Sequence, residues 1–503
     1  LRVVKPMLRT ALNAEEIAGL SEKAFFKTNA LIAGRWQSST TGDTFAVDNP
    51  ATDEVVALVA NCGEIETEHA IAAAKDALAG WAQTPAKHRA RILRAWFDLI
   101  IENEQDLACL LTVEQGKPLD EALSEVRYGA SYIEWFSEEA KRIYGDVIPA
   151  PSTDKRIYTL KQPVGVVACI TPWNFPSAML ARKIAPALAA GCTVVCKPAN
   201  ETPLSAFALG HYGIEAGVPA GVINILCGKT QEIGAALTGS SVVRKLSFTG
   251  STAVGKMLTA ACSGTMKRTS MELGGNAPFI VFADANLEAA IDGLMASKFR
   301  NSGQTCVCAN RVLVAEEIIE QFTQMLADRL SKSVLGNGLT QDTTIGPLIQ
   351  KSAVAKVQGL VTRAIEQGAT PMSAHHETPA TGNFVPPLIL KDVTADMEIF
   401  DAEIFGPIAT LISFNHYDQA IKLANQTTAG LAAYVYTQNA STMIKASEQL
   451  EFGIVGINEG IISNEMAPFG GVKESGHGRE GSKYGLEDYL EVKYVCLGGL
   501  HEA

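Results

Sequence analysis

From Val164 onward, short β-branched runs alternate with segments of helical character, and this alternation restricts the possible fold more than any other feature. Four of these runs read as buried strands: residues 164–170, 193–197, 222–226 and 244–248. A regular alternation of strand and helix predicts a parallel, doubly wound sheet, in which ligands bind beyond the carboxyl ends of the strands. We therefore expect three loops to share one crevice: residues 171–176, 198–203 and 249–255.

The remaining chain predicts further units on either side of this sheet. A second series of elements begins near Ala277, with a strand over 279–282 and then a helix that ends near Gly303. In the first third, residues 71, 74, 78 and 81 are apolar at helical spacing, and similar helical segments continue to about Arg142. A strand over 156–161 follows, as an arm or hairpin outside the first domain. At 503 residues and roughly 150 residues per domain, about three folding units are expected.

Composition excludes several classes of protein. The net charge of −12 argues against a general partner that is nucleic acid or an anionic membrane. No run of 18 apolar residues occurs, so no membrane-spanning helix is expected. The ten cysteines contain no CxxC pair, which predicts neither a disulfide framework nor a zinc site, and no metal is expected. This use of cysteine indicates a reducing compartment. We expect the cytoplasm, with the mitochondrial matrix as the alternative. Residues Leu1–Thr10 are basic without acids, as in a fragment of a targeting peptide.

Two glycine-flanked residues indicate acyl chemistry. Glu272 precedes Gly274–Gly275, and Cys306 follows Gly303. A thiol becomes a strong nucleophile as thiolate, and a nearby carboxylate can remove a proton from the thiol or from water. The alternative is a buried thiol and a solvated charge. The glycines favour the functional interpretation, because they let the backbone turn tightly beside a ligand.

Other residues suit a ligand with phosphates and a carboxylate. The turn 248–255 would offer free N–H groups and the Ser251 hydroxyl to a phosphate, or be an ordinary capped helix start. The Asn174 amide suits an oxyanion, or caps its turn. Lys197 suits a ribose hydroxyl or phosphate. Arg182 and Arg300 suit a carboxylate, although isolated arginines on helices are more often surface ion pairs.

One apparent nucleotide motif is interpreted as a decoy. Residues 476–481 match GxGxxG, but no strand–helix–strand unit follows them, so their glycines are expected to form a turn. Neither a GxSxG elbow nor a P-loop occurs, which argues against a serine hydrolase or a P-loop kinase.

Taken together, the motifs resemble the aldehyde dehydrogenase superfamily from about Asn29 to Leu500. They occur in the family's order: Pro172-Trp173-Asn174-Phe175-Pro176, Lys197-Pro198-Ala199, Gly250-Ser251-Thr252, Glu272-Leu273-Gly274-Gly275, Gly303-Gln304-Thr305-Cys306, Glu403-Ile404-Phe405-Gly406-Pro407 and Pro468-Phe469-Gly470-Gly471. The resemblance implies an α/β fold of two doubly wound parallel-sheet domains with a small β oligomerisation arm. It also implies this division: a dinucleotide-binding domain over 1–142 and 163–271, a catalytic domain over 272–480, and the arm from 143–162 and 481–503.

A narrower resemblance is to the succinate-semialdehyde dehydrogenases. It lies in residues 298–308, 458–463 and 481–494. It implies that the substrate's carboxylate is held by Arg182, Arg300 and Ser463. The implied mechanism begins with attack of the Cys306 thiolate on the aldehyde, with the oxyanion held by the Asn174 amide and the backbone N–H of Cys306. Water activated by Glu272 then hydrolyses the thioester.

The resemblance also implies the cofactor, NADP or NAD, with Ser251 at the pyrophosphate and Glu403 at the nicotinamide ribose. The implied cofactor-binding set is Thr171, Pro172, Trp173, Lys197, Ala199, Asn200, Gly250, Ser251, Leu273, Glu403 and Phe405. Asn200 stands where many NAD-preferring relatives have Glu, so we expect NADP to be preferred. Cys308 is either a redox partner of Cys306 or a packed thiol, and the packed thiol is favoured because such a short disulfide loop is demanding.

Several functional alternatives stay open at this stage. The expected partners are a small aldehyde that carries a carboxylate and further copies of the chain, as a homodimer or homotetramer. Another ω-oxo acid, such as glutarate semialdehyde, is the alternative substrate, since one methylene changes binding by only about 1–3 kcal/mol. A nicotinamide-independent thiol hydrolase and a structural protein are alternatives of another class.

Overall fold

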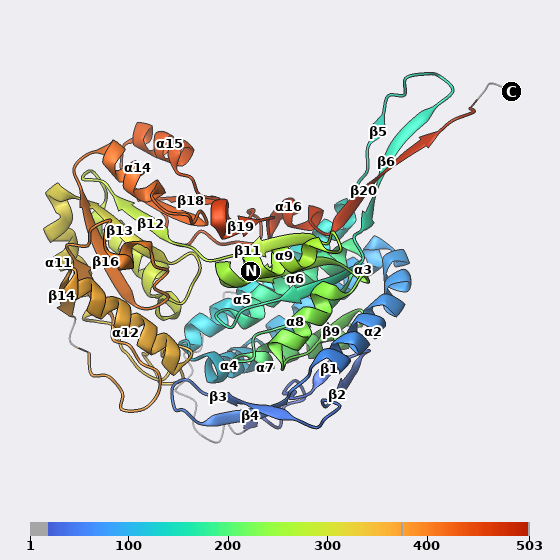
Figure 1. Cartoon of the computed structure of the whole chain (residues 1–503), viewed down its shortest axis with the longest axis horizontal. Coiled ribbons are helices and arrows are strands. Elements are labelled where there is room, and N and C mark those ends of the chain that lie inside the picture. Colours follow the sequence, from blue (N-terminus) through green and yellow to red (C-terminus); the bar gives the residue numbers. More distant parts are fainter. Residues whose placement is uncertain (1–18, 374–375, 501–503) are drawn as a thin grey trace, which may run out of the picture.

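A computed structural model describes residues 19–373 and 376–500, so the expected targeting fragment, Leu1–Thr10, lies outside the described residues. Two sheet-based bodies lie side by side, and a narrow β arm projects away from them (Figure 1). Among the described residues, no helix combines the length and the apolar character needed to cross a bilayer.

The first body is built on an eight-stranded sheet. Its strands in spatial order are β19 (Gly476–His477), β11 (Arg268–Glu272), β10 (Val243–Thr249), β7 (Val166–Ile170), β8 (Thr193–Lys197), β9 (Ile223–Ile225), β1 (Ala30–Ile32) and β2 (Arg35–Gln37). The five strands from β11 to β9 are parallel, which confirms the four strands predicted from β-branched runs. The antiparallel strands β1 and β2, each three residues long, were not predicted.

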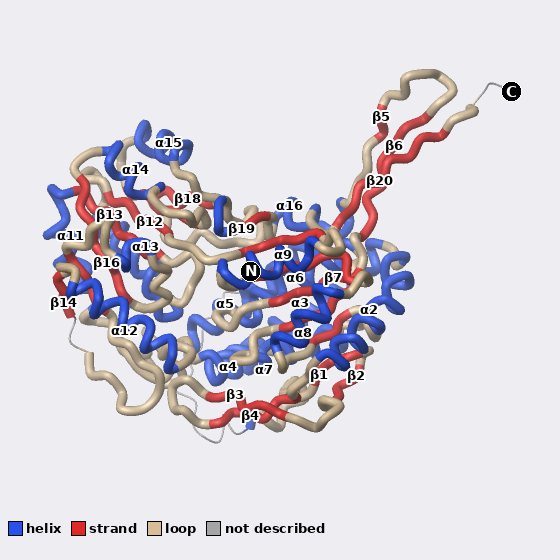
Figure 2. Tube along the Cα trace, in the orientation of Figure 1, coloured by secondary structure: helices blue, strands red, loops and turns tan. Residues whose placement is uncertain are grey.

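Helices cover both faces of this sheet (Figure 2). They are α2 (Glu64–Gln83), α3 (Ala86–Glu102), α4 (Glu104–Gln115), α5 (Leu119–Glu139), α6 (Pro176–Ala190), α7 (Pro203–Glu215), α8 (Thr230–Gly239), α9 (Thr252–Ser263) and α16 (Ser482–Glu487), with a short 3-10 turn, η1 (Ala140–Arg142). Alternate residues of β7 pack on opposite faces: Val166 and Ala168 contact the α2, α8 and α9 side, and Val167 and Cys169 contact the α6 and α7 side. Helix α6 is buried along its whole length, so its two cationic residues need partners.

The second body is built on a seven-stranded sheet. Its strands in spatial order are β14 (Thr370–Ser373), β15 (Leu388–Lys391), β16 (Ile408–Phe414), β13 (Ala309–Ala315), β12 (Ala277–Val281), β17 (Ala432–Tyr436) and β18 (Ile454–Ile457). All neighbouring strands from β15 to β18 are parallel. The associated helices are α10 (Leu287–Leu294), α11 (Ile319–Leu330), α12 (Lys351–Glu366), α13 (Glu398–Asp401), α14 (Tyr417–Asn425) and α15 (Ala440–Gln449). Short 3-10 turns, η4 (Glu316–Ile318) and η5 (Lys473–Ser475), complete this part of the chain.

The arm is a three-stranded antiparallel sheet. A separate two-stranded hairpin is formed by residues in the N-terminal part of the chain. The arm contains β20 (Leu490–Leu497), β6 (Arg156–Pro163) and β5 (Val147–Ile148), and the hairpin contains β3 (Thr44–Asp48) and β4 (Val55–Ala60). Several apolar arm residues face solvent in the single chain, among them Val147, which is 89% exposed, and Tyr494. An exposed apolar surface of this kind is typical of a contact with another protein chain.

Two segments lie differently from the predicted boundaries. Residues Gly476–His477, assigned to the catalytic domain, form β19 and extend the first sheet beside β11. Helix α16, assigned to the arm, packs against α5 and α6, so the arm strand begins only at Leu490. These two segments are consecutive in the chain and are joined by a short connection that contains glycines with a positive φ. The chain therefore packs against the first body again before it enters the arm.

Candidate active site

Cys306 and Glu272 line one cavity of about 320 Å³ between the two bodies. Glu272 is the last residue of β11, whereas Cys306 follows a π-helical turn, η2 (Met295–Phe299), and a 3-10 turn, η3 (Arg300–Gly303). The same cavity is lined by residues of the first and third predicted loops, by the residue after β11 and by a segment before β16: Pro172, Trp173, Asn174, Thr249, Gly250, Ser251, Leu273, Glu403 and Phe405. Two of the three expected loops therefore share a crevice that contains both reactive residues, whereas no residue of the loop 198–203 lines it.

The surroundings of the Cys306 thiol favour its protonated form. Burial raises the pKa of Cys306 to about 12, although the charge of Arg182 acts in the opposite direction. A thiol with so high a pKa is a poor nucleophile until a base removes its proton. Solvent water and Glu272, which lines the same cavity, are the two candidate bases for that step.

Glu272 is a buried carboxyl group without a hydrogen-bond partner among the described residues. Its side chain is 2% exposed. Burial raises the pKa of Glu272 well above its usual value, and the negative charge of Glu480 raises it further. Such a group is a stronger base when ionised than an exposed carboxylate, as general-base catalysis requires.

Glu480 is the second buried carboxyl group, and two cations of α6 keep it ionised. It accepts a hydrogen bond from Arg182 Nε at 2.7 Å and one from Lys183 Nζ at 2.6 Å. Although burial opposes ionisation, these cations lower the pKa of Glu480 to about 2. Sequence reasoning missed both Lys183 and Glu480. Glu480 lies inside the glycine motif interpreted as a decoy. The three glycines of this motif all have a positive φ, although the first belongs to strand β19, and no local pattern indicates the partners of Glu480.

The two arginines expected at the substrate's carboxylate have different surroundings. Arg182 is 1% exposed, is paired with Glu480, and lies 4.2 Å from the centre of the Phe469 ring. Arg300 lies over the Phe175 ring, and its Nε has no hydrogen-bond partner in the described part of the chain. The two guanidinium groups are therefore not both free to bind a ligand. Arg182 is already paired with Glu480, whereas Arg300 has an N–H group without a hydrogen-bond partner in the described part of the chain.

Ser463 lies in the loop that follows β18. The next two residues fasten this loop to α5: the backbone oxygen of Asn464 accepts a hydrogen bond from Tyr132, and the Glu465 carboxylate accepts one from Ser131. A role for Ser463 in binding the substrate stays a prediction.

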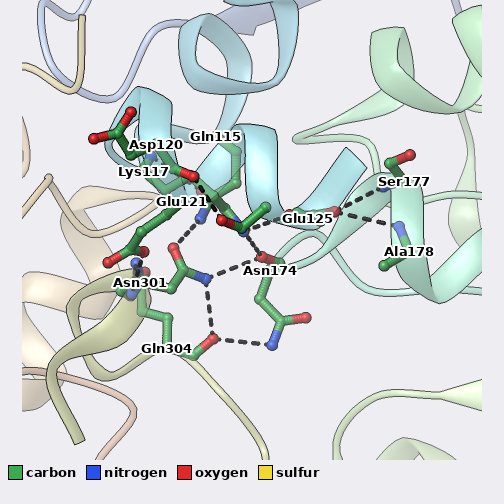
Figure 3. Close-up of polar contacts among 11 residues, drawn as sticks. Gln115, Lys117, Asp120, Glu121, Glu125, Asn174, Ser177, Ala178, Asn301 and Gln304 are labelled. Atoms are coloured by element: carbon green, nitrogen blue, oxygen red, sulfur yellow. Dashed lines mark hydrogen bonds and ion pairs between the residues drawn. The ribbon is translucent and has the colours of Figure 1, made fainter. Parts of the chain in front are cut away.

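Asn174 lies at the cavity wall, directly behind the loop that carries Cys306. Its Nδ2 donates to the backbone oxygen of Gln304 at 2.9 Å, and its Oδ1 has no partner among the described residues. Figure 3 shows that its backbone oxygen is also held, by Lys117 and Asn301. One N–H of the amide group remains for a ligand in the cavity.

Several other residues of the cavity wall suit a dinucleotide. Ser251 caps α9, whose first N–H groups face this region, as anion binding requires. Glu403 accepts a hydrogen bond from the Gly275 N–H at 3.0 Å, and a Cβ on Gly274 would lie 2.9 Å from Glu403 Oε2. Trp173 and Phe405 meet edge to face, with ring centres 5.6 Å apart.

The other expected cofactor residues follow β7 and β8. Thr171 begins the loop that contains Trp173 and Asn174, and Ala199 lies between Lys197 and Asn200. Asn200 Oδ1 accepts from Lys197 Nζ and from the Gly228 N–H, both at 3.2 Å, and Asn200 Nδ2 donates to the Gly228 oxygen at 2.7 Å. A neutral amide therefore faces the Lys197 charge.

Helix α12 contributes residues that sequence reasoning did not identify. Gln350 and Lys356 line the cavity, and Lys356 Nζ donates to the backbone oxygen of Glu403 at 2.8 Å. Nothing in the local sequence distinguishes Lys356 from the other lysines on exposed helix faces. Lys356 can be identified only from the cavity that the two bodies form together.

Cys308 is a packed thiol in this structure. Its Sγ donates to the Lys298 backbone oxygen at 3.6 Å and accepts from Lys298 Nζ at 3.5 Å. Burial raises the pKa of this thiol. These contacts favour the packed thiol over a redox partner of Cys306.

Comparisons with known proteins agree with this geometry. The sequence profile of the aldehyde dehydrogenase family matches residues 36–495. The chain is 53% identical to the NADP-dependent succinate-semialdehyde dehydrogenase of Escherichia coli, over 95% of this chain and 99% of that protein. It is 51% identical to a glutarate-semialdehyde dehydrogenase of Pseudomonas aeruginosa, over 96% and 100% of the two chains. The crystal structure of succinate-semialdehyde dehydrogenase from Burkholderia pseudomallei superposes with a TM-score of 0.93 at 50% identity, over 94% of this chain and 98% of that one.

Proposed function

The chain belongs to the aldehyde dehydrogenase family, and we propose that it oxidises succinate semialdehyde to succinate with NADP or NAD. The observation that carries this proposal is the single cavity that holds Cys306, Glu272 and the residues suited to a dinucleotide. Arg300, with an unpartnered Nε on the segment that leads to Cys306, supports a substrate with a carboxylate. Relatives named for four- and five-carbon ω-oxo acids support the same class of substrate.

In the proposed reaction, the Cys306 thiol loses its proton to solvent water, and its sulfur forms a bond with the aldehyde carbon. The Asn174 amide and the backbone N–H of Cys306 hold the resulting oxyanion. The bound nicotinamide supplies the acceptor for the hydride that leaves this carbon. Glu272 then takes a proton from water, the water oxygen attacks the thioester carbon, and the Cys306 sulfur leaves as the acid is released. The lining residues Ser251, Glu403 and Phe405 would hold the cofactor.

The requirement for a carboxylate on the substrate is tested with Arg300→Gln. A charge-assisted hydrogen bond contributes about 1.5–3 kcal/mol, so kcat/KM for succinate semialdehyde is expected to fall by about 10–100-fold. Butanal, a neutral aldehyde of the same length, is the matched control, and its kcat/KM is expected to change by less than about threefold. An equal loss with both aldehydes would contradict a role for Arg300 in binding the carboxylate. Succinate and glutarate semialdehyde, assayed side by side, determine which chain length is preferred.

The preference for NADP follows from the neutral side chain at position 200. Because Asn200 leaves the Lys197 charge uncompensated, kcat/KM for NADP is expected to exceed that for NAD. Asn200→Glu adds a negative charge that repels a 2′-phosphate and accepts from a free ribose hydroxyl, so the NADP/NAD ratio is expected to fall by about tenfold or more. Asn200→Gln, neutral and of the same length, is the control and keeps the ratio above one. A ratio below one in the unaltered enzyme would refute the preference.

The assembly and compartment are also proposals. The exposed apolar residues of the arm support a homodimer or homotetramer, which light scattering on the purified protein tests directly. The cytoplasm, or alternatively the mitochondrial matrix, is the proposed location, and fractionation of cells tests it.

A further inference from the structure

A buried ion pair lies behind the turn that carries Asn174 (Figure 3). Lys117, between α4 and α5, lies 2.5 Å from Glu125 on α5, and both side chains are 0% exposed. The ammonium group has two further contacts, both with this turn. It donates to the Asn174 backbone oxygen at 2.7 Å and lies 3.9 Å from the centre of the Phe175 ring.

The carboxylate of the pair holds the other end of the same turn. Glu125 Oε1 accepts hydrogen bonds from the backbone N–H groups of Ser177 at 3.0 Å and Ala178 at 3.3 Å. These groups belong to the first turn of α6 and have no partner within the helix. The pair therefore fixes the backbone on both sides of residues 175 and 176.

Asn301 adds a second donor to the same carbonyl group. Its Nδ2 donates to the Asn174 oxygen at 2.9 Å, while its Oδ1 accepts from Gln115 Nε2 at 3.0 Å. Its backbone N–H donates to Glu121 Oε2 at 2.7 Å. Asn301 and Ser302 both have the left-handed backbone conformation, with φ of 52° and 56°, which persists only where surrounding contacts enforce it. The network thus joins the Asn174 turn to the segment that precedes Cys306.

Stability of the fold is a poor explanation for such a pair. Burial disfavours the charged forms of both Lys117 and Glu125, and replacing a buried ion pair by neutral groups often leaves stability unchanged or improves it. What the pair provides is a fixed position for the peptide group of Asn174. The side chain of Asn174 extends from that peptide group to the cavity.

We propose that Lys117 is a positioning residue of the oxyanion hole, because its ammonium group, bonded to the Asn174 carbonyl and to Glu125, holds the Asn174 amide where the oxyanion develops. This inference rests on the proposed function. A donor displaced by about 1 Å loses much of its effect on the transition state in which the oxyanion develops. Loss of Lys117 therefore slows addition of Cys306 to the aldehyde and, with it, the hydride transfer observed in a single turnover.

The test is the double variant Lys117→Met/Glu125→Gln. It leaves no unpaired buried charge, it retains an amide oxygen for the N–H groups of Ser177 and Ala178, and it removes the donor to Asn174. Glu114→Gln is the matched control: Glu114 is an equally buried carboxyl group that accepts from Leu204 N and Ser205 N, both at 2.8 Å, and caps α7 instead of α6. Asn301→Gly, which suits the left-handed backbone, removes the second donor and carries the test if the double variant does not fold.

Two measurements distinguish a displaced Asn174 amide from a general loss of order in the active site. Single-turnover hydride transfer to NADP, measured with succinate semialdehyde and its C1-deuterated form, is expected to slow by about 10–100-fold in the double variant. Alkylation of Cys306 by iodoacetamide needs no oxyanion hole and is expected to change by less than about twofold. Asn301→Gly is expected to slow the same step, and Glu114→Gln to leave it within about twofold of the unaltered enzyme.

Every other outcome contradicts either this inference or the proposed function. Unaltered hydride transfer in the double variant would overturn the inference, as would parallel losses of hydride transfer and alkylation, or an equal loss in Glu114→Gln. If the unaltered enzyme reduced no cofactor with succinate semialdehyde or with any aldehyde tried, the proposed function would fail, and the inference with it. An active unaltered enzyme with equally active variants would refute the inference alone.

Discussion

Cys306→Ala is expected to lower kcat for aldehyde oxidation by at least about 10⁵-fold, because no bond from protein to substrate can then form. The nearest thiol in sequence, Cys308, cannot substitute for it. That group is buried, is hydrogen-bonded to Lys298, and does not line the cavity. The measurement is the appearance of reduced cofactor by absorbance.

Two controls make this result specific to the nucleophile. Cofactor binding, followed by quenching of tryptophan fluorescence, is expected to persist in Cys306→Ala, since Ser251, Glu403 and Trp173 are unchanged. Cys308→Ala is expected to retain activity within about threefold. A residual rate in Cys306→Ala within a hundredfold of the unaltered enzyme would contradict a covalent mechanism through this residue.

The parts of this site that could be predicted from sequence are those encoded locally. The strands β7, β8 and β10 are β-branched runs, and their ends determine where Asn174, Lys197 and Ser251 lie. Glu272 and Cys306 stand beside glycines whose backbone conformations are needed there: Gly303 has a φ of +76°, and a Cβ on it would lie 2.2 Å from the Gly406 oxygen. Such signals need no knowledge of which segments meet in space.

The parts that could not be predicted depend on contacts between distant segments. Glu480 is paired with Arg182 and Lys183, which lie almost 300 residues earlier in the chain. An arginine on a helix carries no sequence signal for such a partner, and for this reason the expected pair of free guanidinium groups was not found. Lys117 and Lys356 resemble solvated lysines in sequence, and only packing shows what each one contacts.

Glu272→Gln is expected to separate the two halves of the reaction. Glutamine has nearly the same shape but cannot take a proton from water, so the thioester on Cys306 accumulates. One equivalent of reduced cofactor per Cys306 should therefore appear in a burst, followed by a steady-state rate about 10²–10⁴-fold below that of the unaltered enzyme. Quenched-flow measurement of the burst, with mass spectrometry of the acylated Cys306, checks this. Full turnover without a burst would show that another group activates the water.

The pH dependence of the same variant identifies the base. General-base catalysis requires ionised Glu272, and its folded pKa is raised well above the ordinary value of 4.5, so the rate is lost as pH falls through that raised pKa. The acid limb of kcat is therefore expected to lie well above pH 4.5 in the unaltered enzyme and to vanish in Glu272→Gln. Glu480, the neighbouring buried carboxyl group, cannot produce this limb. Its pKa is lowered to about 2, far below the acid limb expected from the raised pKa of Glu272.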